Sequence, residues 1–167
     1  ALNTVNAATT VNVTATAVTA IGGTAAQLAT TYGGGITGLG NEAITVSDSI
    51  TSAQANTIDA YTTGAVTATI STTAIADLDD LTGTGNAYTI TVADSSVTAA
   101  ALNTVNAATT VNVTATAVTT ITGTAAQLAT TYGGGITGLG NEAITVSDAN
   151  ITSVSYTHLT LPTRGLG

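Results

Sequence analysis

The chain has 167 residues and is acidic, with nine Asp and Glu against one Lys or Arg, a formal net charge of −8 and no cysteine. Residues 1–153 contain no Lys, Arg or His, so binding to nucleic-acid phosphates or to an anionic membrane surface is electrostatically disfavoured. The lack of cysteine excludes disulfide frameworks, thiol nucleophiles and cysteine-based zinc sites. Every apolar run is far shorter than the roughly 18–20 residues that span a bilayer.

A duplicated stretch organises the sequence. Residues 1–48 return as residues 101–148, with threonine in place of Ala20 and of Gly22. A repeat of this kind is typical of stacked units, none of which can bury its apolar face alone. We therefore expect residues 1–153 to form one continuous repeat array with a 100-residue period and sub-units of about 22–32 residues, cut from a longer array.

Six short stretches are rich in β-branched residues and alternate apolar with polar side chains, which indicates strands. They span residues 11–15, 43–46, 66–70, 88–92, 111–115 and 143–146. The intervals between them leave room for the crossovers that parallel strands require. The pattern predicts an α/β solenoid, with a single parallel β-sheet of about six strands and short, right-handed crossovers that are helical or irregular. The alternative is a parallel β-helix whose crossovers are also strands, because Thr and Val favour strands.

Three of the predicted crossovers can be aligned with one another, and they span residues 1–10, 49–64 and 95–110. In this alignment Asn56 matches Asn103 and Asn3, which predicts equivalent structural positions for the three asparagines. Apolar residues at i and i+3, such as Leu102 and Val105, indicate short amphipathic helices. Their threonine content makes these helices weak on their own.

Two further residue types have predicted structural roles. Asp48 and Asp94 lie between a strand and the crossover that follows it, where an N-cap accepts hydrogen bonds from backbone N–H groups. Gly85 and Gly140 precede the next predicted strand, where glycine supplies the positive φ of a turn.

The composition changes abruptly after Ser153. Residues 154–164 contain the only His, Pro and Arg of the chain, and they resemble the in-frame translation of a sequencing-library adapter. We therefore expect residues 154–167 to be a non-native tail and exclude His158 as a site. With that histidine set aside and no lysine, only carboxylates could act as bases. We predict no enzymatic activity and assign no catalytic or cofactor-binding residue.

Calcium and ice are the two ligands that the residues suggest. Asp77, Asp79, Asp80 and Asn86 carry the hard oxygen ligands that calcium prefers, although the spacing of an EF-hand is absent. These four residues are the candidate metal ligands. Pairs of threonines two residues apart place two hydroxyls on one face of a strand, as in the flat arrays of ice-binding solenoids. The pairs are 67 and 69, 89 and 91, and 114 and 116.

The phrases AITVSD, AQANTIDAYTTGAVTATI, LTGTGNAYTITVAD and GTAAQLA carry a family resemblance. They resemble the repeats of giant Thr/Ala/Gly-rich, lysine-poor surface proteins of bacteria, especially marine cyanobacteria. The resemblance implies an extracellular or cell-surface location and a structural, adhesin-like role as a spacer or multivalent contact surface. The implied partners are adjacent repeats of the same chain and components of the cell surface or extracellular matrix. The alternative function is a calcium-binding or ice-binding repeat module.

Overall fold

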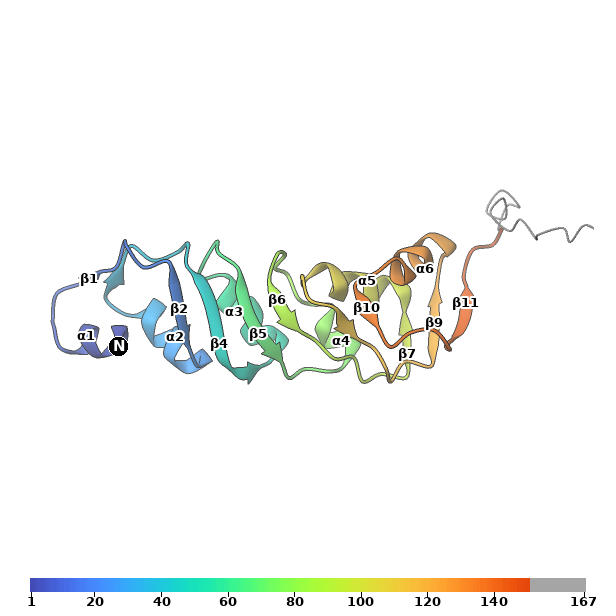
Figure 1. Cartoon of the computed structure of the whole chain (residues 1–167), viewed down its shortest axis with the longest axis horizontal. Coiled ribbons are helices and arrows are strands. Elements are labelled where there is room, and N and C mark those ends of the chain that lie inside the picture. The colour runs from blue at the N-terminus through green and yellow to red at the C-terminus, as the bar shows by residue number, and fades with distance from the viewer. Residues whose placement is uncertain (151–167) are drawn as a thin grey trace, which may run out of the picture.

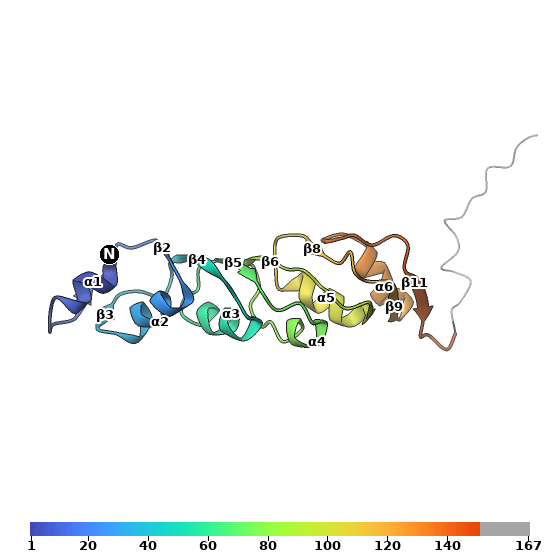
Figure 2. The same cartoon turned by 90° about the horizontal axis from the view of Figure 1, so that it is seen from below.

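The computed structural model describes residues 1–150, which form an elongated molecule. In Figures 1 and 2 its helices follow one another along the long axis in chain order, and Figure 2 shows α2 and α3 on one side of strands β2, β4 and β5. The helices are α1 (Leu2–Ala7), α2 (Ala25–Gly33), α3 (Ser52–Asp59), α4 (Ile75–Leu78), α5 (Ala99–Ala107) and α6 (Ala125–Tyr132). The predicted boundary at residue 153 and the predicted tail lie outside the described residues.

The described strands are short, and all of their pairings are parallel. Five of them are β1 (Val13–Thr14), β2 (Ala20–Gly23), β3 (Ile36–Thr37), β4 (Ala43–Ile50) and β5 (Val66–Ile70). The others are β6 (Ala87–Thr89), β7 (Ser96–Thr98), β8 (Val113–Thr114), β9 (Thr120–Gly123), β10 (Ile136–Thr137) and β11 (Ala143–Val146).

The prediction of a solenoid with a single sheet of about six strands is wrong. Hydrogen bonds join the strands into four separate parallel sheets, in the orders β1-β3, β2-β4-β5-β6, β7-β9-β11 and β8-β10. The alternative β-helix is wrong as well, because helices occupy the crossovers.

The division into four sheets follows from which parts of neighbouring segments pair. β1 pairs with β3 and β2 pairs with β4, each at an offset of 23 residues, so the same two segments form two separate ladders. Two local irregularities also interrupt the ladders. The register between β4 and β5 shifts between Thr45 and Ser49, and the segment after β6 reaches β8 through an isolated bridge between Thr91 and Thr114.

Threonine starts most of the helices. Thr24, Thr51 and Thr124 are the N-caps of α2, α3 and α6, and each side chain accepts a hydrogen bond from the backbone N–H three residues later. A glutamine at that third position returns a bond to the N-cap amide, which completes a capping box. These reciprocal bonds satisfy amides that would otherwise lack a partner at the helix start.

The core is one cluster of apolar side chains that runs from Leu28 to Leu128 along the molecule. In β5 the side chains of Val66, Ala68 and Ile70 are buried and the threonines between them are exposed. The helices contribute residues at the predicted i,i+3 spacing, such as Leu102 and Val105, both 0% exposed.

The two sequence copies occupy different environments. Ile44 in β4 is 1% exposed, whereas its counterpart Ile144 in β11 is 51% exposed. β4 pairs with β2 on one side and β5 on the other, but among the described residues β11 pairs with β9 alone. Equivalent positions in the two copies therefore have nearly the same sequence but different burial. A substitution in one copy can be compared with the same substitution in the other.

Candidate functional site

The two aspartates that were predicted to be N-caps contact helices that precede them in the chain. The Oδ1 atom of Asp48, in β4, accepts a hydrogen bond of 2.9 Å from the Ala25 N–H at the start of α2. The Oδ2 atom of Asp94 likewise accepts one of 2.7 Å from the Ile75 N–H of α4. The expectation that Asp48 caps the following crossover is wrong, because Thr51 is the N-cap of α3. Each aspartate instead accepts a hydrogen bond from a backbone amide at the N-terminus of the preceding helix.

The three asparagines that match in the sequence alignment make equivalent hydrogen bonds. Each donates from its side-chain Nδ2 to a backbone carbonyl 24 residues later in the chain. The donor and acceptor residues are Asn3 and Gln27, Asn56 and Asp80, and Asn103 and Gln127. These bonds connect a helix to the next segment along the molecule.

The two glycines singled out in the sequence both have positive φ. Gly85 has a φ of 79° and Gly140 a φ of 144°, within the range that favours glycine. Both lie in loops that lead into the next strand, so a side chain there would strain the backbone.

Sequence reasoning missed a buried carboxylate in the loop before β4. Glu42 is 0% exposed. Both of its carboxylate oxygens accept from the Gly40 N–H at 2.9 Å, and the Tyr32 hydroxyl donates to Oε2 at 2.9 Å. The Tyr32 ring stacks on that of Tyr61 with 4.7 Å between the ring centroids. A tyrosine and a glutamate ten residues apart occur in both copies. This recurrence is the sequence pattern that could have predicted the contact between them.

Burial and hydrogen bonding act in opposite directions on this carboxylate. Burial favours the neutral acid, but backbone amides of the Gly40–Glu42 loop and the Tyr32 hydroxyl stabilise the charged form and lower the pKa of Glu42. Burial raises the pKa of Tyr32, and the hydrogen bond to Glu42 and its charge raise it further. The pair is therefore a neutral tyrosine donating to a carboxylate at neutral pH.

Replacing Glu42 by glutamine is expected to lower the free energy of unfolding at pH 7 by about 2 kcal/mol, because the buried amide cannot satisfy all of its hydrogen-bonding groups. A lowered folded-state pKa stabilises the protein above the unfolded pKa of about 4.3, and this stabilisation is lost as the pH falls through the folded value. The wild type should therefore lose stability below about pH 4 more steeply than Glu42→Gln. Urea unfolding at a series of pH values measures both effects.

The counterpart in the second copy is the control for this substitution. Glu142 makes the same bonds to Gly140 and Tyr132, but it is only half-buried. Glu142→Gln should cost under about 1 kcal/mol. An equal loss for the two variants would contradict the role of burial.

The structure divides the four candidate metal ligands. Asp77 and Asp80 line one groove, whereas Asp79, the C-cap of α4, is not part of its lining. Asn86 is buried elsewhere and donates to the Asp59 carboxylate at 2.7 Å. Within residues 1–150 no three His, Cys, Asp or Glu side chains are grouped so that they could hold a metal ion.

A row of hydroxyl groups crosses the exposed face of the four-stranded sheet. Thr67 pairs with Thr45, and Thr69 pairs with Ser49 on one side and Thr89 on the other. All five side chains are exposed. Asp48 is the only charged residue within the strands of residues 1–150, and its side chain is bonded to α2. This face is therefore uncharged on a strongly acidic chain.

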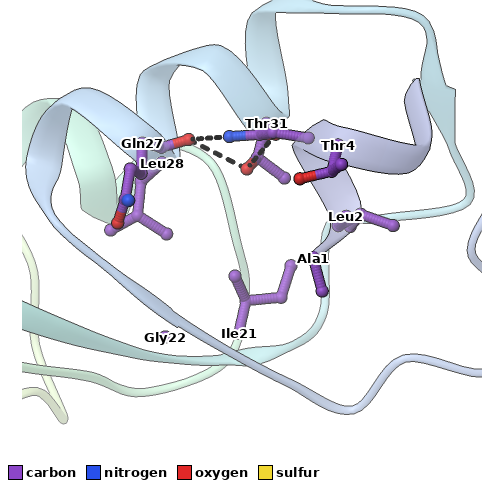
Figure 3. A pocket seen from close by; sticks show the side chains of 9 residues that line it. Ala1, Leu2, Thr4, Ile21, Gly22, Gln27, Leu28 and Thr31 are labelled. Carbon is purple, nitrogen blue, oxygen red and sulfur yellow. Dashed lines mark hydrogen bonds between the residues drawn. The ribbon is translucent and has the colours of Figure 1, made fainter. Parts of the chain in front are cut away.

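A cavity of about 180 Å³ lies between α1, β2 and α2 (Figure 3). Ile21, Leu28 and Thr31 are among its lining residues, and none of the lining side chains is acidic or basic. In the second copy the carbonyl of Ala99 accepts from Thr131, the counterpart of Thr31, and Ala99 is 0% exposed. Thr31 thus lines a cavity, whereas its counterpart Thr131 is buried against the backbone of Ala99.

No family model, curated protein or solved structure matches the chain. Among the helices of residues 1–150, none combines the length and the apolar character needed to cross a membrane.

Proposed function

We propose that the chain is a structural and adhesive segment of a secreted or cell-surface protein, acting as a spacer and as a multivalent contact surface. The supporting observation is the recurrence of the same bonds between segments. Asp48 bonds to a helix 23 residues before it, and Asn56 bonds to a carbonyl 24 residues after it. Bonds of this kind hold neighbouring segments at fixed positions along an elongated molecule.

Three carboxylates, those of Asp48, Asp94 and Glu42, are engaged in holding the fold together. Asp48 and Asp94 each accept from a helix amide, and buried Glu42 is bonded to a loop amide and a tyrosine. These groups are structural, which is why we propose no catalytic role. The proposed partners are components of the cell surface or extracellular matrix, and many weak contacts from repeated units would supply avidity.

A tandem series tests the spacer function. Chains with one, two and three copies of the 100-residue period would be compared by small-angle X-ray scattering. The maximum dimension should grow in proportion to the number of copies, because each copy extends the long axis. A compact protein would instead grow with about the 0.38 power of its length, and that result would refute a spacer.

Ice binding is the second candidate function, and the row of exposed hydroxyls favours it. Threonine side chains are stiff at χ1, so paired strands hold their hydroxyls in a regular array. Thermal hysteresis of the full chain measures this activity. Thr69→Lys should abolish it, whereas Thr57→Lys on the exposed surface of α3 should leave it unchanged. A wild-type chain without thermal hysteresis would exclude this candidate.

A further inference from the structure

The first sequence copy leaves open an apolar face that the second copy buries. A groove of about 390 Å³ lies between α1 and β2, and it is lined by four large apolar side chains, those of Leu2, Val5, Val18 and Ile21. Val5 is 54% exposed, and the other three are half-buried. Their counterparts in the second copy are at most 2% exposed, namely Leu102, Val105, Val118 and Ile121. Nearly the same sequence therefore forms an open face in one place and a covered face in the other.

Residues 71–98 cover this face in the second copy. They include α4, which packs against α5, and β7, which pairs with β9. In that pairing Val97 stands opposite Ile121, and the side chain of Val97 is 5% exposed. The open face of the first copy and the segment that covers its counterpart are thus both defined by residues of this chain.

Backbone hydrogen bonds hold this covering segment in place. The N–H groups of Thr110 and Thr119 each donate to a carbonyl of the segment at 2.8 Å. The equivalent residues of the first copy are Thr10 and Thr19, and both are exposed. Within residues 1–150 no hydrogen bond is found from the backbone N–H of either residue. Unpaired N–H groups beside an apolar groove favour the addition of another chain segment by main-chain hydrogen bonding.

We propose that the face formed by α1, β2 and the N–H groups of Thr10 and Thr19 binds a segment with the sequence of residues 71–98. Another chain built of the same repeat would present it as an uncovered end segment. The chain's own residues 71–98 are not available, because β6 pairs with β5 and β7 pairs with β9. Such binding would join repeat arrays end to end.

Charge does not oppose this binding. The segment carries four aspartates, but residues 1–41 contain no acidic side chain that would repel them. The proposed surface does not depend on the spacer or the ice-binding function, because it needs only the fold of the first copy. Its partner is defined by the contacts that the same sequence makes in the second copy.

Thiol labelling can test this surface, because the chain contains no cysteine. Val5→Cys places one thiol on the proposed surface. Val11→Cys is the matched control at a site that is exposed in both copies, since Val11 is 73% exposed and Val111 is 39% exposed. The probe is a synthetic peptide of residues 71–98, added to each full-length variant at up to about 1 mM. Saturating peptide should slow the labelling of Val5→Cys at least about tenfold, because labelling requires an accessible thiolate, and it should leave Val11→Cys unchanged.

The possible outcomes separate a specific surface from general stickiness. Slower labelling of Val5→Cys alone supports the proposal. No change at about 1 mM peptide would overturn it. Equal slowing at both positions, or slowing by a peptide of the same composition in scrambled order, would show non-specific binding and overturn it as well. Labelling of Val5→Cys that slows with rising protein concentration in the absence of peptide would identify a second intact copy as the partner, and it would overturn the assignment to residues 71–98.

Discussion

Replacing Ile44 by alanine is expected to lower the free energy of unfolding by about 4 kcal/mol. The side chain is 1% exposed and lies in β4, at the centre of a sheet that continues on both sides. Its removal loses the transfer free energy of the buried carbons and leaves a cavity that paired strands on either side cannot close. Urea unfolding followed by circular dichroism measures the loss.

The second copy supplies the control for this experiment. Ile144 stands in the same sequence, AITVSD, but it is 51% exposed. Ile144→Ala removes the same carbons from a site that is already in contact with water, so it should cost less than about 1 kcal/mol. A loss at Ile144 as large as that at Ile44 would mean that β11 is covered in solution.

Gly64→Ala is expected to lower the free energy of unfolding by about 3 kcal/mol, by overpacking. An added Cβ would meet the backbone of Glu42 and Ala43, with 2.7 Å to the Glu42 carbonyl carbon and 3.0 Å to the Ala43 nitrogen. These atoms belong to the backbone next to the buried Glu42 side chain, so they cannot move without disturbing the hydrogen bonds of its carboxylate. Thermal unfolding and urea titration both report the change.

Replacing a second glycine, Gly33, by alanine is expected to change the free energy of unfolding in the opposite direction. Gly33 is the last residue of α2, and an added Cβ there would have no heavy atom within 4 Å. Alanine is a better helix former than glycine and restricts the unfolded chain, so Gly33→Ala should stabilise the protein by about 0.5–1 kcal/mol. Destabilisation at both glycines would show that the effect at Gly64 is not due to its close contacts.

The alternation of β-branched residues located some of the strands but not the sheets. The stretch 66–70 matches β5, and 43–46 falls within β4. The pattern missed β2 (AIGG) and β3, an Ile-Thr pair between glycines, because strands with so few side chains show no alternation. The division into four sheets depends on which segments lie side by side, such as β1 with β3 and β2 with β4, and no local pattern of residues encodes this.

Helix starts were readable in principle. The sequences TAAQ at residues 24–27 and TSAQ at 51–54 match the capping box. The sequence analysis nevertheless assigned the N-cap role to aspartates, because Asp is also a favoured N-cap residue. The actual partner of Asp48 lies 23 residues earlier. Such a bond depends on how segments stack, which the sequence around the aspartate does not specify.

The groove beside α4 is a further case in which local sequence did not specify which residues lie together. The run of three aspartates within four residues was visible, but which of them share a cavity depends on where the short helix ends. Asn86 was grouped with the aspartates because its side chain carries an oxygen that calcium accepts, and the fold buries it against Asp59 instead.

The bond from Asp48 back to the first amide of α2 sets an order for folding during synthesis. A chain that leaves the ribosome N-terminus first exposes α2 well before the aspartate that completes its hydrogen bonding. Asp148 stands in the same relation to α6, since it accepts from the Ala125 N–H, 23 residues earlier. Each of these helices therefore reaches its final stability one segment behind the emerging end, and an array of such segments would assemble in the direction of translation.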